Sequence, residues 1–233
     1  MRGVGMAEFC VAELFSSING EGTRAGQLAV FVRFAGCNLH CSYCDTAWAN
    51  QRETEYQRMN EDEILREIQR TGITNVTLTG GEPLLREGIE VLLETLLSDC
   101  NLWIEIETNG SIPLEKFQEL ARRKTALERL SFTMDYKLPK SGMESEMCLE
   151  NMGVLQLKDT VKFVCSDWKD LERAEQVIEE YRLTEKCHVY FSPVFGKLDP
   201  AKMVLFMKER NLNGVNLQLQ LHKFIWNPEQ RGV

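Results

Sequence analysis

The sequence predicts an α/β fold whose mostly parallel sheet forms a partial (β/α)6 barrel, open on one side. Short runs rich in β-branched and aromatic residues alternate with helix-length amphipathic segments, which is typical of parallel strands joined by right-handed crossovers. About six such units are too few to close an eightfold barrel. A doubly wound open sheet is the competing architecture, because hydrophobic periodicity alone does not fix how a sheet closes.

The predicted elements follow one another along the chain without a linker or an internal repeat. A strand over 28–34 leads into Gly36. Asn60, with Glu63 three residues later, forms a capping box that starts a helix running to about residue 70. Further strands are predicted over 75–79, 102–107, 130–134, 160–165, 188–191 and 215–219, and further helices over 88–98, 114–123, 170–181 and 199–210. We therefore expect residues 1–233 to form a single domain.

The composition is that of an ordinary globular protein, and the net charge argues against nucleic acid and anionic membranes as partners. Of the 233 residues, 43% are hydrophobic and 27% are charged. The 27 basic and 35 acidic residues give a net charge of −8, which repels nucleic acid and anionic lipid. No apolar run reaches the roughly 18 residues of a membrane helix, and residues 1–7 lack the apolar core of a signal peptide. We expect a cytoplasmic protein without a nucleic-acid or membrane partner, with Met1 or Met6 as its first residue.

Three of the eight cysteines lie close together, directly after the first predicted strand. Cys37, Cys41 and Cys44 form the pattern C-x3-C-x2-C. Structural zinc usually takes four protein ligands, and no fourth Cys or His follows at a suitable spacing. A 4Fe-4S cluster usually takes four cysteines, so three leave one iron open to another ligand. The spacing favours the cluster, with zinc and unligated thiols as the alternatives.

A second motif follows the strand predicted over 75–79. The paired glycines Gly80 and Gly81 let the backbone approach a ligand closely, and the Glu82 carboxylate can accept from an ammonium group. Alone, this segment would be an ordinary strand-to-helix turn. Together with the cysteine pattern, it resembles the GGE segment of the radical S-adenosylmethionine (SAM) superfamily.

That resemblance implies a fold, two cofactors and a reductant. The fold is the partial (β/α)6 barrel, and the catalytic residues are the three cysteines, which hold a 4Fe-4S cluster whose open iron binds SAM. An electron from the reduced cluster then splits SAM to give a 5′-deoxyadenosyl radical. The reductant is expected to be a flavodoxin or ferredoxin.

Further segments, spread over nearly the whole chain, resemble the 7-carboxy-7-deazaguanine synthase family. They are residues 13–22, Gly26, 31–38, 44–46, 105–110, 135–137, 192–193 and 220–224. The resemblance implies conversion of 6-carboxy-5,6,7,8-tetrahydropterin to 7-carboxy-7-deazaguanine, with ring contraction and loss of ammonia. A hydrogen is abstracted from C6 and later returned, which regenerates SAM. A homodimer and a Mg²⁺ ion are implied as well. A glycyl-radical activating enzyme, which shares the cluster and cofactor, is the alternative function.

The substrate's chemistry matches residues just before the cysteines. The planar fork of Arg33 suits the carboxylate, and Glu21 can accept from the guanidine-like edge of the pterin. Asn19 can donate or accept a hydrogen bond. Many family members have the longer Gln at this position, so contact through a water molecule is an alternative for the shorter Asn side chain. The substrate-binding residues implied are Ile18, Asn19, Gly20, Glu21, Arg33, Thr79 and His222. For His222, packing at the end of the domain is an equal alternative.

The cofactor positions come from the same resemblance. The SAM contacts implied are Tyr43, Gly81, Glu82, Glu107, Asp135, Tyr136, Lys137, Ser192, Pro193, Val194 and Phe195. Acids at strand ends such as Glu107 and Asp135 suit ribose hydroxyls or an ammonium group, although they also cap helices. The Thr46 hydroxyl is implied as a Mg²⁺ ligand, and a loop threonine bonded to backbone is the alternative. The roles of 138–159 (lid, dimer contact or surface excursion), Asp45 and the extension 229–233 stay open.

Overall fold

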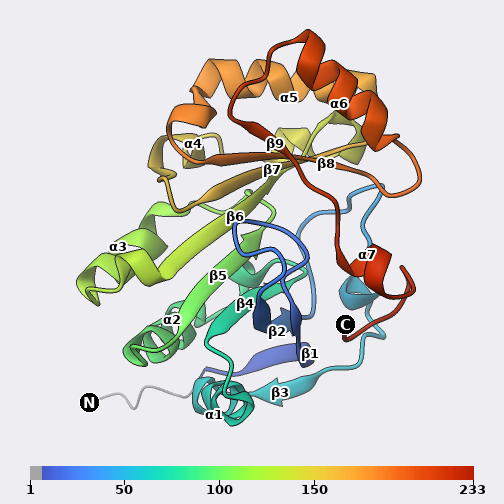
Figure 1. Cartoon of the computed structure of the whole chain (residues 1–233). Helices are drawn as coiled ribbons and strands as arrows, with labels where there is room; N and C mark the ends of the chain where they lie inside the picture. Colours follow the sequence, from blue (N-terminus) through green and yellow to red (C-terminus); the bar gives the residue numbers. More distant parts are fainter. Residues whose placement is uncertain (1–6) are drawn as a thin grey trace.

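The computed structural model describes residues 7–233, so the choice between Met1 and Met6 lies outside it. Within these residues one curved sheet of nine strands runs through the molecule (Figure 1). Its strands are β1 Phe9–Ile18, β2 Leu28–Phe34, β3 Gln57–Met59, β4 Asn75–Gly80, β5 Trp103–Thr108, β6 Leu130–Tyr136, β7 Thr160–Cys165, β8 His188–Pro193 and β9 Val215–Leu217. In the same part of the chain no helix is both long and apolar enough to cross a membrane.

The strand order confirms a partial barrel and excludes the doubly wound alternative. The order is β3-β1-β2-β4-β5-β6-β7-β8-β9, and every pair from β2 to β9 is parallel. Each parallel strand lies beside the one before it, whereas a doubly wound sheet reverses direction at a switch point. The sheet ends at β3 and β9 without closing.

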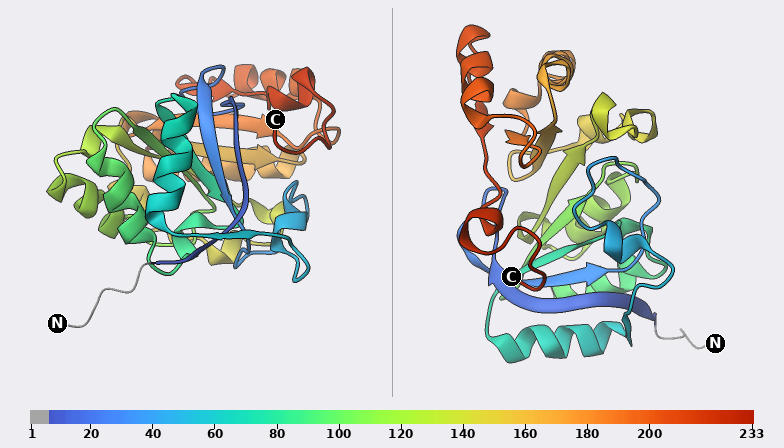
Figure 2. Two further views of the ribbon diagram at one scale, coloured as in Figure 1. Left: turned by 90° about the horizontal axis from the view of Figure 1, so that it is seen from below. Right: turned by 90° about the vertical axis from the view of Figure 1, so that its right-hand side faces the viewer.

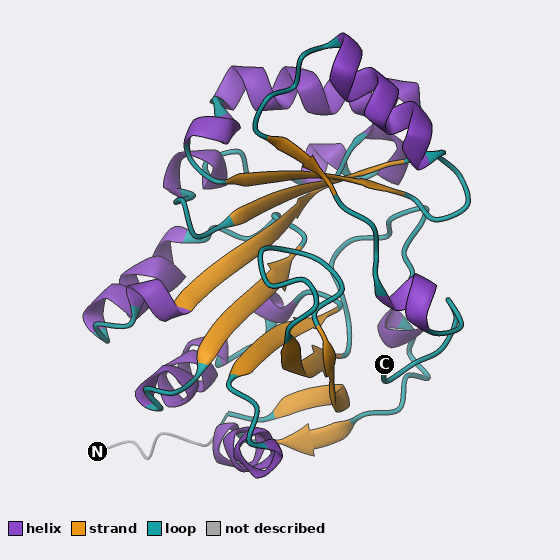
Figure 3. Ribbon diagram, in the orientation of Figure 1, coloured by secondary structure: helices purple, strands orange, loops and turns teal. Residues whose placement is uncertain are grey.

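The larger helices cover the convex face of this sheet (Figures 1, 2 and 3). The helices are α1 Glu61–Thr71, α2 Ile89–Ser98, α3 Glu115–Arg123, α4 Asn151–Val154, α5 Trp168–Tyr181, α6 Pro200–Glu209 and α7 His222–Ile225. Short 3-10 turns are η1 Ala47–Asn50, η2 Pro83–Leu85, η3 Leu127–Arg129, η4 Pro139–Ser141, η5 Glu144–Glu146 and η6 Leu183–Glu185. The capping box of α1 is confirmed: Asn60 and Glu63 each accept the other's backbone N–H at 2.9 Å.

The parallel strands carry apolar and polar residues in alternation, and this separates the core from the site. In β5, Ile104 and Ile106 belong to the buried core, whereas Glu105 and Glu107 point the other way. The same alternation places Phe163 in the core and Lys162 on the concave face. The convex face therefore packs on the helices, and the concave face is lined with polar side chains.

Two strands of the sheet, β1 and β3, were not predicted from the sequence. β1 pairs antiparallel with both β2 and β3 and extends the sheet beyond the parallel strands. Much of β1 is only half-buried on both faces, so its sequence lacks the strict alternation that identifies a strand. At the other end, β9 stops at Leu217, two residues before its predicted end. The next side chain, Gln218, bonds instead to the backbone of Gly22, with N–H to Oε1 at 2.8 Å.

The segment 138–159, whose role the sequence left open, packs against the cysteine loop. It forms η4, η5 and α4. Ser42, inside the cysteine loop, donates its N–H to the Ser141 carbonyl at 3.0 Å and its hydroxyl to the Lys140 carbonyl at 2.6 Å. The segment is therefore a support for this loop.

Candidate active site

A cavity of about 510 Å³ lies on the concave face, at the carboxyl ends of the parallel strands. This is where α/β barrels place their ligands. The predicted site residues that line it are Ile18, Gly20, Glu21, Arg33, Cys37, Cys41, Tyr43, Cys44, Thr46, Thr79, Gly81, Glu107, Asp135, Lys137, Val194, Phe195 and His222. The residues predicted for the cluster, for SAM and for the pterin thus share one space.

Five predicted residues do not line this cavity: Asn19, Glu82, Tyr136, Ser192 and Pro193. Tyr136 follows Asp135 on β6, and consecutive strand residues point to opposite faces. Its buried ring packs on Phe163 on the convex side, with the centroids 5.5 Å apart. The Ser192 hydroxyl donates to Glu21 at 3.2 Å, so Ser192 contacts a residue of the cavity wall.

Glu82 connects the ends of two strands. Its fully buried carboxylate accepts from the backbone N–H of Asn109 at 2.7 Å, from the Thr108 hydroxyl at 2.9 Å and from the Leu84 N–H at 3.0 Å. Burial raises the pKa of Glu82, and these three donors counteract part of that rise. Glu82 therefore fixes the turn after β4 against the end of β5, and its contact with an ammonium group stays a prediction.

Asn19 lies beneath the cavity wall. Its side-chain carbonyl accepts from the Thr77 hydroxyl at 2.9 Å, while its buried amide nitrogen has no partner among the described residues. Neighbouring Gly20 contacts α7: Leu221 donates its N–H to the Gly20 carbonyl at 3.2 Å. A methyl group on Gly20 would lie 2.9 Å from Nδ1 of His222. The loop after β1 and α7 thus form one corner of the cavity.

The cysteine loop presents three half-buried, unpaired thiols to the cavity. Cys37 accepts the N–H of Leu39 at 3.4 Å and the side-chain N–H of Asn109 at 3.5 Å. Burial raises the pKa of the Cys41 thiol. Among residues 7–233, no three His, Cys, Asp or Glu side chains stand in position to hold a single metal ion. The thiols share the cavity wall, and their role as cluster ligands stays a prediction.

The paired glycines let the cysteine loop lie directly on the turn after β4. A Cβ on Gly81 would lie 1.9 Å from the Gly36 carbonyl oxygen, so only glycine fits there without a shift of the loop. The two segments are also hydrogen-bonded: Gly81 donates to the Phe34 carbonyl and Glu82 donates to the Gly36 carbonyl, both at 3.0 Å. Arg86 donates to the carbonyls of Ala35 at 2.7 Å and Gly36 at 3.2 Å.

The cation predicted for the substrate carboxylate is held in place by β1. Arg33 and Glu13 are register partners on β2 and β1, and Arg33 Nε donates to Glu13 Oε2 at 3.0 Å. The Arg33 guanidinium also lies over the Phe15 ring, 5.8 Å from its centroid. Both supporting residues line the cavity and were missed, because the sequence did not identify β1.

Thr46 and residues 228–233 line the cavity near the cysteine loop. The Thr46 hydroxyl makes no capping hydrogen bond to η1, although Thr46 precedes that turn. Residues 228–233 line the cavity, and the Arg231 guanidinium lies 4.0 Å from the centroid of the Trp48 ring. The extension 229–233 is therefore part of the cavity wall. Asp45, whose role was open, pairs with Lys223 at 3.5 Å.

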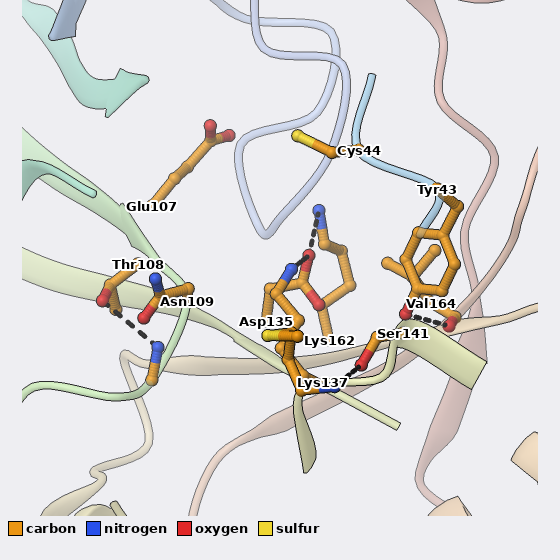
Figure 4. A network of polar contacts seen from close by, with 12 residues as sticks. Tyr43, Cys44, Glu107, Thr108, Asn109, Asp135, Lys137, Ser141, Lys162 and Val164 are labelled. Carbon is orange, nitrogen blue, oxygen red and sulfur yellow. Dashed lines mark hydrogen bonds and ion pairs between the residues drawn. The ribbon is translucent and has the colours of Figure 1, made fainter. Parts of the chain in front are cut away.

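Lys162, at the centre of β7, is the main residue of the site that sequence reasoning missed (Figure 4). Its ammonium group lies 2.8 Å from Glu21 Oε2 and 3.9 Å from Asp135 Oδ2. Asp135 pairs with Lys137 as well, at 2.9 Å. Burial opposes a charge on Lys162, but the carboxylates of Glu21, Asp135 and Glu107 outweigh burial and raise its pKa. In the sequence, Lys162 could have been recognised as a candidate because it is a lysine between apolar residues in a predicted strand.

A buried carboxylate beneath the cavity gives a test of these electrostatics. Glu105 is 4% exposed and accepts from the Thr133 hydroxyl. Burial, followed by repulsion from Glu107, raises the pKa of Glu105 from 4.5 to about 7. Between these values the unfolded chain releases a proton that the folded chain keeps, so this residue lowers folding stability as the pH rises through the window.

We expect Glu105→Gln to remove this pH dependence, because glutamine keeps the polar contact but does not titrate. Relative to the wild type, the variant should gain about 3 kcal/mol in free energy of unfolding between pH 4.5 and 7. Urea unfolding of both proteins between pH 4.5 and 8 measures the difference. A difference that stays constant with pH would show that Glu105 ionises alike in the folded and unfolded chain.

The chain is similar to known proteins in sequence and in fold. A sequence profile of the Radical SAM superfamily matches residues 31–136. A protein of Clostridium acetobutylicum named 7-carboxy-7-deazaguanine synthase is 54% identical over 223 residues, which cover 96% of this chain and 98% of that protein. A protein of the same name from Chlorobaculum tepidum is 36% identical and covers 96% of each chain. The crystal structure of QueE from Escherichia coli shares the fold, with a TM-score of 0.69 and 20% identity over 91% of this chain and 94% of that one.

Proposed function

The chain belongs to the 7-carboxy-7-deazaguanine synthase family of radical SAM enzymes, and from this premise we propose how its cavity divides between cofactor and substrate. The enzyme converts 6-carboxy-5,6,7,8-tetrahydropterin to 7-carboxy-7-deazaguanine. Its relatives do not favour the glycyl-radical activating alternative. The observation that carries the proposal is that one cavity is lined both by Cys37, Cys41 and Cys44 and by Glu21 and Arg33.

We assign the cofactor half of the cavity to the cysteine loop and the ends of β4, β5, β6 and β8. Cys37, Cys41 and Cys44 would hold a 4Fe-4S cluster, which when bound with SAM supplies the 5′-deoxyadenosyl radical. Asp135 Oδ1 and Asn50 Oδ1 are buried oxygens of cavity residues without a partner among the described residues, so this half suits a ligand with donor groups. Tyr43, Gly81, Glu107, Lys137, Val194 and Phe195 complete the SAM side. Glu82, Tyr136, Ser192 and Pro193 would support it from behind.

The substrate half is formed by the end of β1, β2 and α7. In the hydrogen bonds of the described residues, the Arg33 side chain uses only Nε, which donates to Glu13, so its terminal amino groups can form a bidentate pair with the pterin carboxylate. Glu21 accepts from the guanidine-like edge of the ring. The same half is lined by Ile18, Gly20, Thr79 and His222. Asn19 lies behind this wall, where it contacts Thr77. Trp48 and residues 228–233 limit the access of water.

A Mg²⁺ ion at Thr46 is part of the proposal. Thr46 lines the cavity, and its hydroxyl contacts Cys44 Sγ at 3.7 Å but is not used as a helix cap, so it can serve as the single protein oxygen of a site completed by substrate and water.

We expect Thr46→Ala to raise the Mg²⁺ concentration for half-maximal activity by about tenfold or more, because one ligand is lost. Thr46→Ser keeps the hydroxyl and should behave like the wild type. Initial rates over a Mg²⁺ titration measure both variants. Equal Mg²⁺ dependence of the alanine and serine variants would remove Thr46 from the proposed site.

Assembly and reductant complete the proposal. We propose that residues 1–233 act as one domain, because a single sheet runs through the described part of the chain. A homodimer, a cytoplasmic location and a flavodoxin or ferredoxin as electron donor are proposed from the family resemblance.

Anaerobic turnover tests the function. Reconstituted protein is incubated with dithionite, SAM, Mg²⁺ and 6-carboxy-5,6,7,8-tetrahydropterin. The products are then separated by chromatography and identified by mass spectrometry. We expect 7-carboxy-7-deazaguanine and ammonia. An intact cluster that cleaves SAM but yields no 7-carboxy-7-deazaguanine would contradict the assigned substrate.

A further inference from the structure

Lys162 is the point where the two halves of the cavity meet. It lies on β7, is 8% exposed, and faces the concave side, while its neighbours Val161 and Phe163 lie in the core. Burying an ammonium group is costly unless carboxylates are close. The structure supplies such carboxylates from two different elements, and this arrangement suggests a role beyond packing.

The two carboxylates belong to different halves of the proposed site. Glu21 lies in the loop after β1, and its Oε2 is 2.8 Å from the Lys162 ammonium nitrogen. Asp135 lies on β6, and its Oδ2 is 3.9 Å from the same nitrogen. Figure 4 shows Lys162 and Asp135 side by side, with Glu107 and Cys44 around the same space. One ammonium group thus contacts the substrate side and lies close to the cofactor side.

The two contacts are unequal. Asp135 also pairs with Lys137 at 2.9 Å, so it keeps a cation when Lys162 is removed. Among the described residues, Glu21 has in addition only the Ser192 hydroxyl, at 3.2 Å. Loss of the ammonium group should therefore release Glu21 more than Asp135.

We propose that Lys162 is a positioning residue that fixes the Glu21 carboxylate for the pterin and ties it to Asp135 on the cofactor side. This rests on the proposed division of the cavity. The carboxylates of Glu21, Asp135 and Glu107 raise the pKa of Lys162 and favour its charged form, so Lys162 acts in this proposal as the positive charge that holds Glu21. Its function is to hold the substrate in line with the radical, so that SAM cleavage stays coupled to product formation.

The test compares Lys162→Met with the wild type in anaerobic turnover. We expect the KM for the pterin to rise by more than about tenfold, because Glu21 loses a charge-assisted contact. The KM for SAM should change less, by under about threefold, because Lys137 still holds Asp135. The amount of 5′-deoxyadenosine formed per product should rise. Calorimetric titration of the reconstituted protein with the pterin, in the presence of SAM and Mg²⁺ but without a reductant, should show the same loss of affinity.

Lys158→Met is the matched control. Lys158 is similarly buried, with its side chain 15% exposed against 11% for Lys162, and it pairs with buried Asp159 at 3.3 Å, but it does not line the cavity. This variant should lower thermal stability while leaving the pterin KM and the ratio of 5′-deoxyadenosine to product at the wild-type values.

Two further variants keep the proposal falsifiable if Lys162→Met does not fold. Lys162→Arg keeps a cation of different shape and should raise the pterin KM and the 5′-deoxyadenosine ratio partway. In a Glu21→Gln background, Lys162→Arg should change neither value further, because it acts through Glu21.

The outcomes separate this inference from the function on which it rests. Absence of product from the wild type would overturn the function. Wild-type turnover with an unchanged pterin KM and an unchanged 5′-deoxyadenosine ratio in both Lys162 variants would overturn the positioning role. Equal effects of Lys158→Met and Lys162→Met on these two values would also overturn it, because they would reflect stability alone.

Discussion

Cys41→Ala should yield a folded protein that retains no 4Fe-4S cluster and no SAM cleavage. Cys41 is the middle ligand of the proposed three, and its half-buried thiol lines the cavity. Two remaining thiolates leave two irons without protein ligands, and such a cluster is not held. Iron and sulfide content, the absorption of the anaerobic protein and the yield of 5′-deoxyadenosine measure the result.

Arg33→Ala is the informative contrast. It should keep the cluster and a slow SAM cleavage that is not coupled to product, because Arg33 is proposed to contact the pterin only. The pterin KM should rise about 10- to 100-fold, the value of one or two charge-assisted hydrogen bonds. Cys100→Ala removes an exposed cysteine outside the cavity and should match the wild type. If Cys41→Ala retained its cluster, or if Arg33→Ala lost it, the two roles would be assigned wrongly.

The second large effect is expected at the paired glycines. In Gly81→Ala the added methyl group would lie 1.9 Å from the Gly36 carbonyl oxygen and 2.6 Å from Asn50 Oδ1. Since the nearest atom is backbone, the cysteine loop or the turn after β4 must move. A misplacement of about 1 Å at an active site can cost about 100-fold in rate, and we expect a loss of that order in turnover together with weaker SAM binding.

Gly153→Ala is the control for this substitution. Gly153 has open space around its Cβ position and, like Gly81, its φ lies outside the left-handed region. This variant should be active and at least as stable as the wild type. Kinetics and equilibrium dialysis with SAM measure both proteins. Wild-type SAM affinity in Gly81→Ala would mean that the loop adapts and that the close approach is not required.

The fold could be predicted where the parallel strands have a strong pattern. Buried apolar residues that alternate with helix-length segments identified β2 and β4 to β9, and the capping box identified the start of α1. β1 could not be identified in the same way, because it is an antiparallel strand that is half-buried over much of its length. The strand order, and with it the choice between a partial barrel and a doubly wound sheet, depends on contacts between distant residues.

The sequence indicated which segments lie near the cavity, but it did not indicate which of their side chains point into it. The family resemblance implied Asp135, Tyr136 and Lys137 as one group, yet Asp135 lines the cavity and Tyr136 packs on the convex side. Strand alternation would have separated these two residues. Lys162 belongs to no motif, and its position in the site became visible only in the fold, where its ammonium nitrogen lies 2.8 Å from Glu21 Oε2. Glu13 depended on β1, which the sequence did not identify.

One isotope measurement tests the account most directly. The pterin carrying deuterium at C6 is turned over anaerobically, and the masses of recovered SAM and 5′-deoxyadenosine are determined. Because the residues proposed for the cluster, SAM and the substrate share one cavity, we predict that deuterium passes from C6 into the 5′-methyl group of 5′-deoxyadenosine. This methyl group then holds two hydrogens and one deuterium, so a hydrogen can be returned in place of the deuterium, which stays in the regenerated SAM. Formation of 7-carboxy-7-deazaguanine with no deuterium in SAM or 5′-deoxyadenosine would contradict it.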